Sequence, residues 1–425
     1  MRGMPEPSST PSQAPASDAS GEADRLFRQA VALVGAQRHE EASPLHLRAA
    51  QAGHGHAQLE LARMLLHGVG TATDIPAALH WLHTAEHGGS AVAGYHLALL
   101  GCGDHAVPFD GHVDARLLAA VNAGYPPALL AAAVHFGRKP HADDQQLCLA
   151  LLDRAAQAGS AVAAQLLAER LAAGEGTDAD MAAAEALWKQ LDAHGVARLP
   201  RISVPIPAGT TSTPRALVLQ ELFSPPALKT LSDAPRVAII DHLLSADECR
   251  LLIASSTQRL KRSRAVDPRT GLPMEVELRT SSDATFDPVV QDLALRLVQA
   301  RMAAAAGSRL VDAEQLTVLR YLPGEEYRPH RDYVPPGSLE RDHPQAGNRV
   351  RTICAYLNTV PEGGETEFPH ASLKVAAVAG RVVVFDNLHA DGRPDPDSLH
   401  AGLPVVRGEK WLATLWLRQR RYRDF

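Results

Sequence analysis

The pattern of apolar positions divides the chain into two differently built halves. From about residue 23 to 198, Ala-rich apolar positions recur at helical spacing around glycines spaced by 35, 36, 35 and 36 residues: Gly53, Gly88, Gly124, Gly159 and Gly195. The six residues 48–53 recur identically at 154–159. A period of this length is typical of an α-solenoid, in which successive helix pairs stack on one another. We expect each glycine to end one helix and to permit a tight turn into the next.

The C-terminal half shows the two-residue alternation of β-strands instead. In residues 410–417 one side carries Lys410, Leu412, Thr414 and Trp416, and the other carries Trp411, Ala413, Leu415 and Leu417. Apolar side chains on both sides predict a strand that is largely buried on both faces. Lys410 would then be buried, and a buried ammonium is costly without a partner of opposite charge. The strand therefore predicts an anionic partner for Lys410.

Three residues in this half form a candidate metal site. His330 and Asp332 are two residues apart, so in a strand both side chains point to the same side and can reach one ion. His400 follows much later and must arrive on a strand that folds back beside them. Two imidazoles and one carboxylate bind one face of an iron ion and leave the opposite face open. Oxygen and nitrogen donors favour iron over zinc, which in structural sites more often recruits thiolates.

Two further residues near His400 are rival ligands. Asp386 and His389 follow the apolar run 382–385. Asp386 and Asn387 fit the end of that strand better than a metal site, because polar residues commonly terminate buried strands. His389 ranks below His400, which alone stands in the motif described next.

The C-terminal half resembles the prolyl 4-hydroxylase family of Fe(II)- and 2-oxoglutarate-dependent dioxygenases. The resemblance covers roughly residues 235 to 420 and is not confined to the candidate ligands. It rests on the segments 235–241, 244–249, 279–282, 320–333, 351–352, 356–358, 363–366, 395–402 and 407–411. It implies a double-stranded β-helix (jelly-roll) domain that uses Fe(II), 2-oxoglutarate and O2, with ascorbate as reductant.

The resemblance also assigns roles to individual residues. It implies that His330, Asp332 and His400 bind the iron and that Lys410 binds the distal carboxylate of 2-oxoglutarate. No further catalytic acid, base or nucleophile is required, because the metal and the cosubstrate carry the chemistry.

Four more residues receive roles from the same resemblance. The hydroxyl groups of Thr352 and Tyr321 would help Lys410 to hold 2-oxoglutarate. Tyr327 and Trp416 match positions that face the peptide substrate in this family. The loop between Tyr333 and Asn348 matches the family least well, so the resemblance does not identify the substrate.

The N-terminal half resembles Sel-1-like repeats, a branch of the tetratricopeptide-like solenoids. The resemblance rests on the spacing of Ala, Gly and Leu in residues 49–61 and on Gly68, Gly70 and Asp74 after it. The third repeat departs from the pattern, since two prolines follow Tyr125 and no Gly-x-Gly turn closes the unit. Solenoids of this kind commonly bind peptides or proteins on a concave face. The alternative is that this solenoid only packs on the catalytic domain or mediates dimers.

Composition narrows the class of protein. The 425 residues are 45% hydrophobic and 21% charged, with a formal net charge of −6, which does not favour nucleic-acid binding. We expect no membrane segment and no signal peptide, because no apolar run is long enough or suitably placed. The four cysteines, Cys102, Cys148, Cys249 and Cys354, show no paired spacing, which indicates a reducing compartment and a cytoplasmic protein.

We therefore predict a multidomain chain: a disordered tail (1–22), an all-α solenoid (23–198), a linker or extra strand (199–234) and a jelly-roll dioxygenase (235–425). The predicted function is hydroxylation of a peptidyl prolyl residue in a protein substrate, with the solenoid recruiting a partner or the substrate. One alternative is hydroxylation of another residue or of a small molecule. The other is a solenoid scaffold whose oxygenase domain acts as a sensor.

Overall fold

The computed structural model describes residues 16–102, 107, 111–206, 213–263, 265–266, 273–274, 278–335 and 337–424. The chain forms two compact units, Met1–Leu97 and Ala98–Phe425. Their boundary falls within helix α5 (Ala91–Gly101). Of the predicted tail, residues 1–15 lie outside the described residues. Residues 16–22 belong to helix α1 (Ala16–Gly35), which continues backward from the buried Ala23 and Leu26.

The first unit consists of antiparallel helix pairs. After α1 come α2 (His39–Gln51), α3 (Gly55–His67) and α4 (Ile75–His87). Its core contains Leu26, Ala49, Ala50, Ala57 and Leu61, with Trp81 packed against it. Alanine at the buried positions lets neighbouring helices approach closely, which explains the Ala-rich repeats of the sequence.

The helix pairs continue into the second unit as α6 (Gly111–Asn122), α7 (Pro126–Gly137), α8 (Ala142–Gln157), α9 (Ala161–Ala173) and α10 (Met181–Ala193). Gly53, Gly124, Gly159 and Gly195 have positive φ, as a turn between helices requires. In the second repeat this position is Gly89 (φ +91°), whereas Gly88 caps α4 with φ −74°, so the turn comes one residue later than the spacing predicts.

The irregular third repeat still forms a helix pair. Tyr125 precedes α7, and Pro126 and Pro127 occupy its first turn. Proline is tolerated there because the amide hydrogens of the first turn have no partner within the helix. The prolines that break the sequence pattern therefore start the second helix of the pair.

The predicted double-stranded β-helix is confirmed. Eight antiparallel strands form the larger sheet in the order β1-β2-β13-β9-β16-β7-β6-β3, and four form the smaller sheet in the order β12-β11-β14-β8. The larger sheet consists of β1 (Lys229–Asp233), β2 (Arg236–Ile240), β3 (Lys261–Arg262), β6 (Ser282–Thr285), β7 (Thr317–Tyr321), β9 (Arg349–Tyr356), β13 (Val382–Asp386) and β16 (Lys410–Arg418). The smaller sheet consists of β8 (Tyr327–His330), β11 (Thr366–Phe368), β12 (Leu373–Val375) and β14 (His400–Gly402).

The facing sides of the two sheets enclose the apolar core of this domain. Val237, Val383, Phe385 and Leu412 of the larger sheet lie in one cluster with Phe368 of the smaller sheet. Two short strand pairs complete the β-structure, β10 (Glu362–Gly363) with β15 (Val405–Arg407) and β4 (Ala265–Val266) with β5 (Pro273–Met274). β1 lies in the segment predicted as a linker or extra strand, where it pairs with β2.

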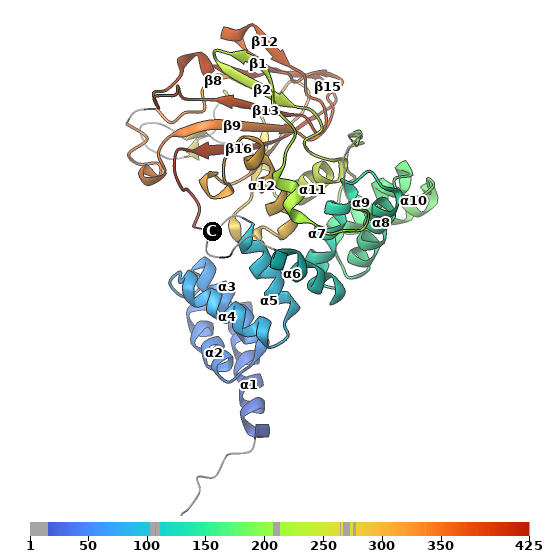
Figure 1. Cartoon of the computed structure of the whole chain (residues 1–425), viewed down its shortest axis with the longest axis vertical. Helices are drawn as coiled ribbons and strands as arrows, with labels where there is room; N and C mark the ends of the chain where they lie inside the picture. Colours follow the sequence, from blue (N-terminus) through green and yellow to red (C-terminus); the bar gives the residue numbers. More distant parts are fainter. Residues whose placement is uncertain are drawn as a thin grey trace, which may run out of the picture. The chain divides into compact units, whose positions relative to one another are not determined.

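Two helices join the sheet to the solenoid helices of the same unit. α11 (Ala246–Thr257) contacts α7 and α9 on one side and β6 and β7 on the other, and α12 (Leu293–Ala305) contacts α7 and β16. Figure 1 shows both helices between the sheet and the helices α7 to α9. α11 begins with a capping box, in which Ser245 and Glu248 satisfy each other's backbone amides.

A buried ion-pair network fixes α11 to α9. Arg170 Nη1 donates to Asp247 Oδ2 at 2.5 Å, and Arg250 Nη1 donates to Asp247 Oδ1 at 3.0 Å. Burial alone would raise the pKa of Asp247, but the two guanidinium groups hold it below its usual value. Gly137 makes the contact possible, since a Cβ there would collide with Asp247 Oδ2.

We expect Asp247→Ala to lower the free energy of unfolding by about 3–5 kcal/mol, because it leaves two buried guanidinium groups without their shared carboxylate. Urea unfolding of the full-length protein measures this change. Asp153→Ala removes an exposed carboxylate of α8 and serves as the control, with stability close to that of the wild type. Equal stabilities of the two variants would show that the network does not hold α9 and α11 together.

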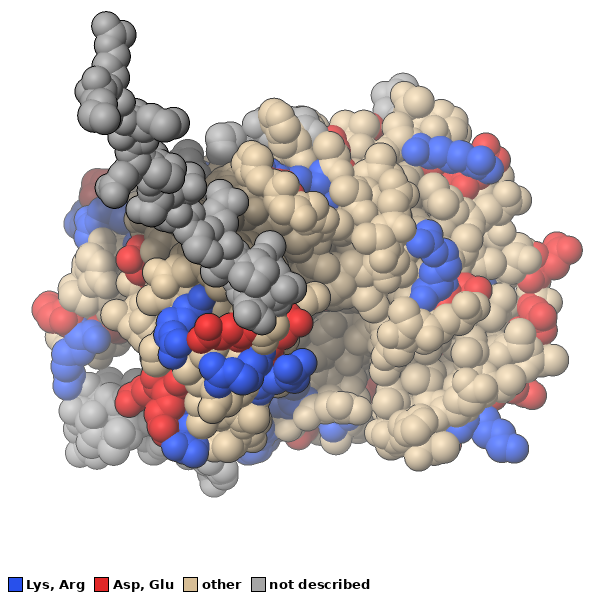
Figure 2. All heavy atoms as spheres, turned by 90° about the horizontal axis from the view of Figure 1, so that it is seen from below, with Lys and Arg blue, Asp and Glu red and all other residues tan. Residues whose placement is uncertain are grey.

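Within the described part of the chain, no single helix is both long and apolar enough to span a membrane, and His112–Asn122 and Pro126–Gly137 meet the requirement only as a pair bent by 119°. On the face drawn in Figure 2, the coloured Lys and Arg side chains are interspersed with Asp and Glu.

Candidate metal centre

The structure brings His330, Asp332 and His400 together. Their candidate ligand atoms all lie within 4.8 Å of one another, and no other described residues form such a group. His330 ends β8, and His400 begins β14 directly opposite it in the register of the two strands. Asp332 lies two residues beyond the end of β8, so His330 and Asp332 do not share one strand as the sequence predicted. Their side chains converge nevertheless.

The arrangement of the two imidazoles fits a metal ion. His330 Nδ1 lies 2.9 Å from Arg328 O, and His400 Nδ1 lies 2.9 Å from Ser398 O. Each Nδ1 therefore donates to a carbonyl, and each Nε2 is left with a lone pair. The Nε2 atoms lie 3.6 Å and 3.7 Å from the two carboxylate oxygens of Asp332, respectively. This donor set, open on one side, fits Fe(II).

The charge states also suit a metal. Burial and the neighbouring His400 lower the pKa of His330, so this imidazole is neutral at neutral pH. Burial would raise the pKa of Asp332, but His400, His330 and Arg349 outweigh it and lower the pKa, so Asp332 is ionised. A neutral imidazole and an ionised carboxylate are the forms that bind metals.

A short chain of hydrogen bonds orients Asp332. Thr352 Oγ1 donates to Asp332 Oδ2 at 2.8 Å and accepts from Asn387 Nδ2 at 2.9 Å. All three side chains are buried. In the structure the hydroxyl group of Thr352 therefore binds the candidate metal ligand Asp332. The role of Thr352 in binding 2-oxoglutarate stays a prediction.

We expect Thr352→Val to weaken Fe(II) binding by about 10- to 100-fold, because the hydroxyl that orients the ligand carboxylate is lost. If the hydroxyl serves only Asp332, the affinity for 2-oxoglutarate at saturating iron stays unchanged. Metal titration of the purified protein measures the first quantity. Thr257→Val is the matched control, since that hydroxyl bonds only within α11. A loss of 2-oxoglutarate affinity with normal iron affinity would favour the predicted cosubstrate role instead.

Lys410 lies in the same pocket as the three candidate ligands. Its side chain is 1% exposed, and its Nζ lies 5.3 Å and 5.6 Å from the ring centres of Tyr321 and Tyr356. Burial lowers the pKa of Lys410 to about 8. Among the described residues, no carboxylate lies within ion-pair distance of this ammonium group. The predicted need for an external anionic partner therefore agrees with the geometry.

The other predicted residues surround this pocket. Tyr321 pairs with Lys410 across β7 and β16, and its hydroxyl group interacts with Ser281 and Arg279. The Tyr327 ring stacks on His330 at 3.4 Å between ring centres, which restricts the rotation of that imidazole. Trp416 lines the pocket below the guanidinium of Arg349, 4.3 Å from its ring centre.

Several pocket residues were not assigned a role from the sequence. The lining also includes Arg279, Leu319, Cys354, Thr366, Gly402, Leu412 and Thr414. Leu412 and Thr414 share a strand face with Lys410, so the two-residue alternation could have identified them. Arg279 reaches the pocket from the segment 279–282, and the only signal for it in the sequence was the family motif to which this segment belongs.

The rival ligands lie away from the candidate ligand cluster. Asp386 ends β13 and pairs with Arg351, its Oδ1 lying 2.5 Å from Nε. The His389 side chain is 46% exposed and has Asp395 as its neighbour. Neither belongs to the cluster of candidate ligands.

Comparisons with known proteins decide the family. A sequence profile of the 2OG-Fe(II) oxygenase superfamily matches residues 316–418. Prolyl 4-hydroxylase 1 of Arabidopsis thaliana is 34% identical over 207 residues, which are 45% of this chain and 72% of that protein. The chain belongs to the prolyl 4-hydroxylase family. It is accordingly a 2-oxoglutarate-dependent dioxygenase that uses Fe(II) and O2, and ascorbate is the reductant typical of prolyl hydroxylases.

Two solved structures each resemble a part of this prolyl 4-hydroxylase family member. A viral collagen prolyl hydroxylase from Paramecium Bursaria Chlorella virus-1, in complex with 2OG, has a TM-score of 0.35 and 27% identity, over 44% of this chain and 98% of that one. A Sel1 repeat protein from Oxalobacter formigenes has a TM-score of 0.37 and 22% identity, over 42% of this chain and 75% of that one.

Proposed function

We propose that the protein hydroxylates a prolyl residue within a protein or peptide substrate. The proposal rests on family membership together with one observation: the three candidate ligands and the buried Lys410 line a single pocket. Bound Fe(II) and 2-oxoglutarate supply the oxidation, which converts a C–H bond to C–OH while O2 is consumed and 2-oxoglutarate becomes succinate and CO2. The residues of the chain bind and orient these partners.

Each side chain has a defined task in this proposal. His330, Asp332 and His400 hold the iron on one face. Lys410 binds the distal carboxylate of 2-oxoglutarate, and the aromatic rings beside it exclude water. Exclusion of water strengthens the electrostatic interaction between the ammonium and the carboxylate.

The surface beside β8 supports a peptide substrate. Arg328 of β8 donates its amide hydrogen to Leu278 O, and the segment 324–325 bonds to Val405. The neighbouring side chains Leu278, Leu322 and Val406 are exposed to 38%, 41% and 60%. Leu278 and Leu322 directly adjoin the pocket residues Arg279 and Tyr321 in the chain, and exposed apolar side chains of this kind suit contact with a bound peptide.

Proline-containing peptides incubated with the protein, Fe(II), 2-oxoglutarate and ascorbate test this proposal. Mass spectrometry of the peptide should show the gain of one oxygen at proline, with an equal amount of succinate. Peptides with alanine in place of proline are the control. Oxygen incorporated into another residue, or into a small molecule only, would contradict prolyl hydroxylation.

The solenoid helices are proposed to recruit the substrate or a partner. α6 to α10 belong to the same compact unit as the oxygenase domain, so a chain bound there is held at a fixed distance from the pocket. Full-length Asp332→Ala protein serves as a trap for cellular proteins, and wild-type protein is then added to the captured proteins. A captured protein that gains an oxygen supports recruitment, and capture without oxygenation favours the scaffold alternative.

A further inference from the structure

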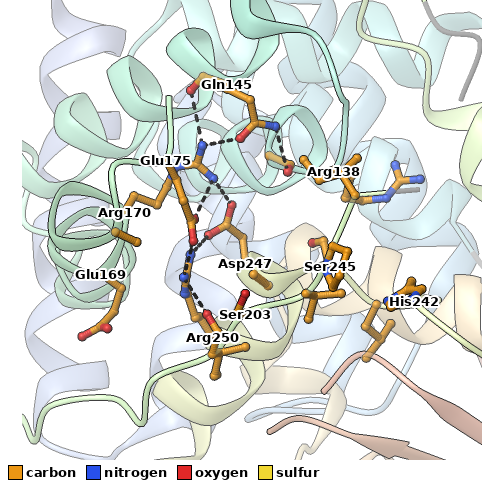
Figure 3. A pocket seen from close by; sticks show the side chains of 18 of the residues that line it. Arg138, Gln145, Glu169, Arg170, Glu175, Ser203, His242, Ser245, Asp247 and Arg250 are labelled. Carbon is orange, nitrogen blue, oxygen red and sulfur yellow. Dashed lines mark hydrogen bonds and ion pairs between the residues drawn. The ribbon is translucent and has the colours of Figure 1, made fainter. Parts of the chain in front are cut away.

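A second and much larger pocket lies in the second unit, apart from the candidate metal centre. Its volume is about 1020 Å³. Its walls come from the C-terminal ends of α7 and α9, from the segment 198–206 and from the start of α11 (Figure 3). A volume of this order is typical of sites for small organic ligands.

The lining of this pocket carries an excess of positive charge. Seven of its residues are Lys or Arg and four are Asp or Glu, so the wall is positive even when Glu248 behind it is included. The carboxylates already have partners. Glu175 binds Arg250 through both oxygens at 2.6 Å and 2.7 Å, and Asp247 is shared by Arg170 and Arg250.

Arg138 is a cation of the pocket wall that lies outside this network. Its Nε and Nη1 atoms are enclosed and have no hydrogen-bond partner among the described residues. Its Nε lies 3.8 Å from Glu248 Oε1, but Glu248 already accepts from Arg301 Nη1 at 2.8 Å and from the backbone amide of Ser245 at 2.7 Å. Figure 3 shows the guanidinium of Arg138 turned away from the network centred on Asp247.

This arrangement is costly without a ligand. Burial and the neighbouring Arg301 lower the pKa of Arg138 to about 10, which still leaves the group charged at neutral pH. The two enclosed nitrogen atoms lack the hydrogen bonds that water would provide. His242 adds an enclosed Nδ1 without a partner to the same pocket. At the rim, Met181 and Ile206 are apolar side chains exposed to 50% and 39%.

We propose that this pocket binds a small organic anion, whose carboxylate or phosphate group contacts Arg138 and whose apolar part lies against the rim. The Arg138 side chain lines the pocket and is 15% exposed, so its positive charge can attract either anionic group. The volume and the apolar rim favour an organic anion over an inorganic one. The site is separate from Lys410, so it does not depend on the proposed hydroxylation.

Calorimetric titration of the full-length protein tests the proposal with three probes: phenylacetate, phenyl phosphate and inorganic phosphate. The titrations compare wild type, Arg138→Gln and the control Arg259→Gln, which changes an exposed arginine after α11. At least one organic probe should bind wild type and the control alike, and bind Arg138→Gln about tenfold or more weakly. Inorganic phosphate should bind more weakly than phenyl phosphate. Binding at Lys410 would not respond to Arg138→Gln.

Thermal unfolding without any probe separates binding from a structural role. Removing a cation that has two enclosed nitrogen atoms without hydrogen bonds should leave the melting temperature of Arg138→Gln at or above that of wild type. A clear fall would mean that Arg138 is a structural ion-pair partner and would overturn the proposal. Failure of both organic probes to bind, equal affinity of wild type and Arg138→Gln, or equal binding of the two phosphates would overturn it as well.

Discussion

Asp332→Ala is expected to abolish Fe(II) binding at micromolar metal and to reduce turnover by on the order of 1000-fold or more, because the only anionic donor of the cluster is removed. The same loss is expected for His330→Ala and His400→Ala. The folded structure should survive, since none of the three side chains belongs to the apolar cluster between the two sheets. Metal analysis, circular dichroism and succinate release measure the three quantities.

His389→Ala is the matched control for this prediction. It removes an imidazole eleven positions before His400 that has an exposed side chain and lies outside the cluster. Full activity of this variant with loss in His400→Ala would support the ligand assignment. Unchanged turnover in Asp332→Ala, or lost iron binding in His389→Ala, would show that the iron is bound elsewhere.

Lys410→Met is expected to weaken binding of 2-oxoglutarate by about 100-fold or more, because a buried charged contact is removed. A cosubstrate analogue without the distal carboxylate, such as 2-oxobutyrate, tests the contact directly. Wild type should prefer 2-oxoglutarate strongly, and Lys410→Met should bind both compounds with similar affinity. Competition experiments under anaerobic conditions measure the two affinities.

Two controls accompany the Lys410 prediction. Lys374→Met removes a lysine whose side chain is 58% exposed, and it should leave the preference intact. The ligand-free Lys410→Met protein should be at least as stable as wild type, since burial of an unpaired ammonium is removed. If the variant still discriminated between the two compounds, another cation would have to bind the distal carboxylate.

Binding of 2-oxoglutarate should also depend on pH through Lys410. Burial depresses the pKa of the free lysine to about 8, and a bound carboxylate raises it. Above about pH 8 the ligand therefore binds together with a proton, and the affinity should fall about tenfold between about pH 7 and about pH 9. Titrations in buffers of different ionisation enthalpy count the protons taken up. Proton uptake that persisted in Lys410→Met would assign the effect to another group.

The sequence predicted those parts of the site that follow from rules acting between residues close together in the chain. The two-residue spacing of His330 and Asp332 and the alternation around Lys410 follow directly from strand geometry. His400 was predicted only because a motif accompanies it, and the structure places it opposite His330 in the neighbouring strand. The helix pairs likewise follow from local periodicity, whereas the double-stranded β-helix was predicted from the family resemblance.

The contacts that escaped prediction join residues that are distant in the chain. Thr352 binds Asp332 across 20 positions, and Asp247 binds Arg170 across 77. No periodic pattern encodes such pairs, because they depend on how strands and helices pack. Arg138 is similar, since the enclosure of its Nε and Nη1 atoms without hydrogen bonds becomes visible only when α7 and α11 are placed together.

The most direct test of the central claim needs no substrate. Fe(II) and then 2-oxoglutarate are added to the purified protein without oxygen, and the visible spectrum is recorded. The weak charge-transfer band of iron chelated by a 2-oxo acid should appear in wild type, be absent in His400→Ala and be weaker in Lys410→Met. A folded wild-type protein that shows no band under these conditions would contradict the assignment of this pocket as the iron and 2-oxoglutarate site.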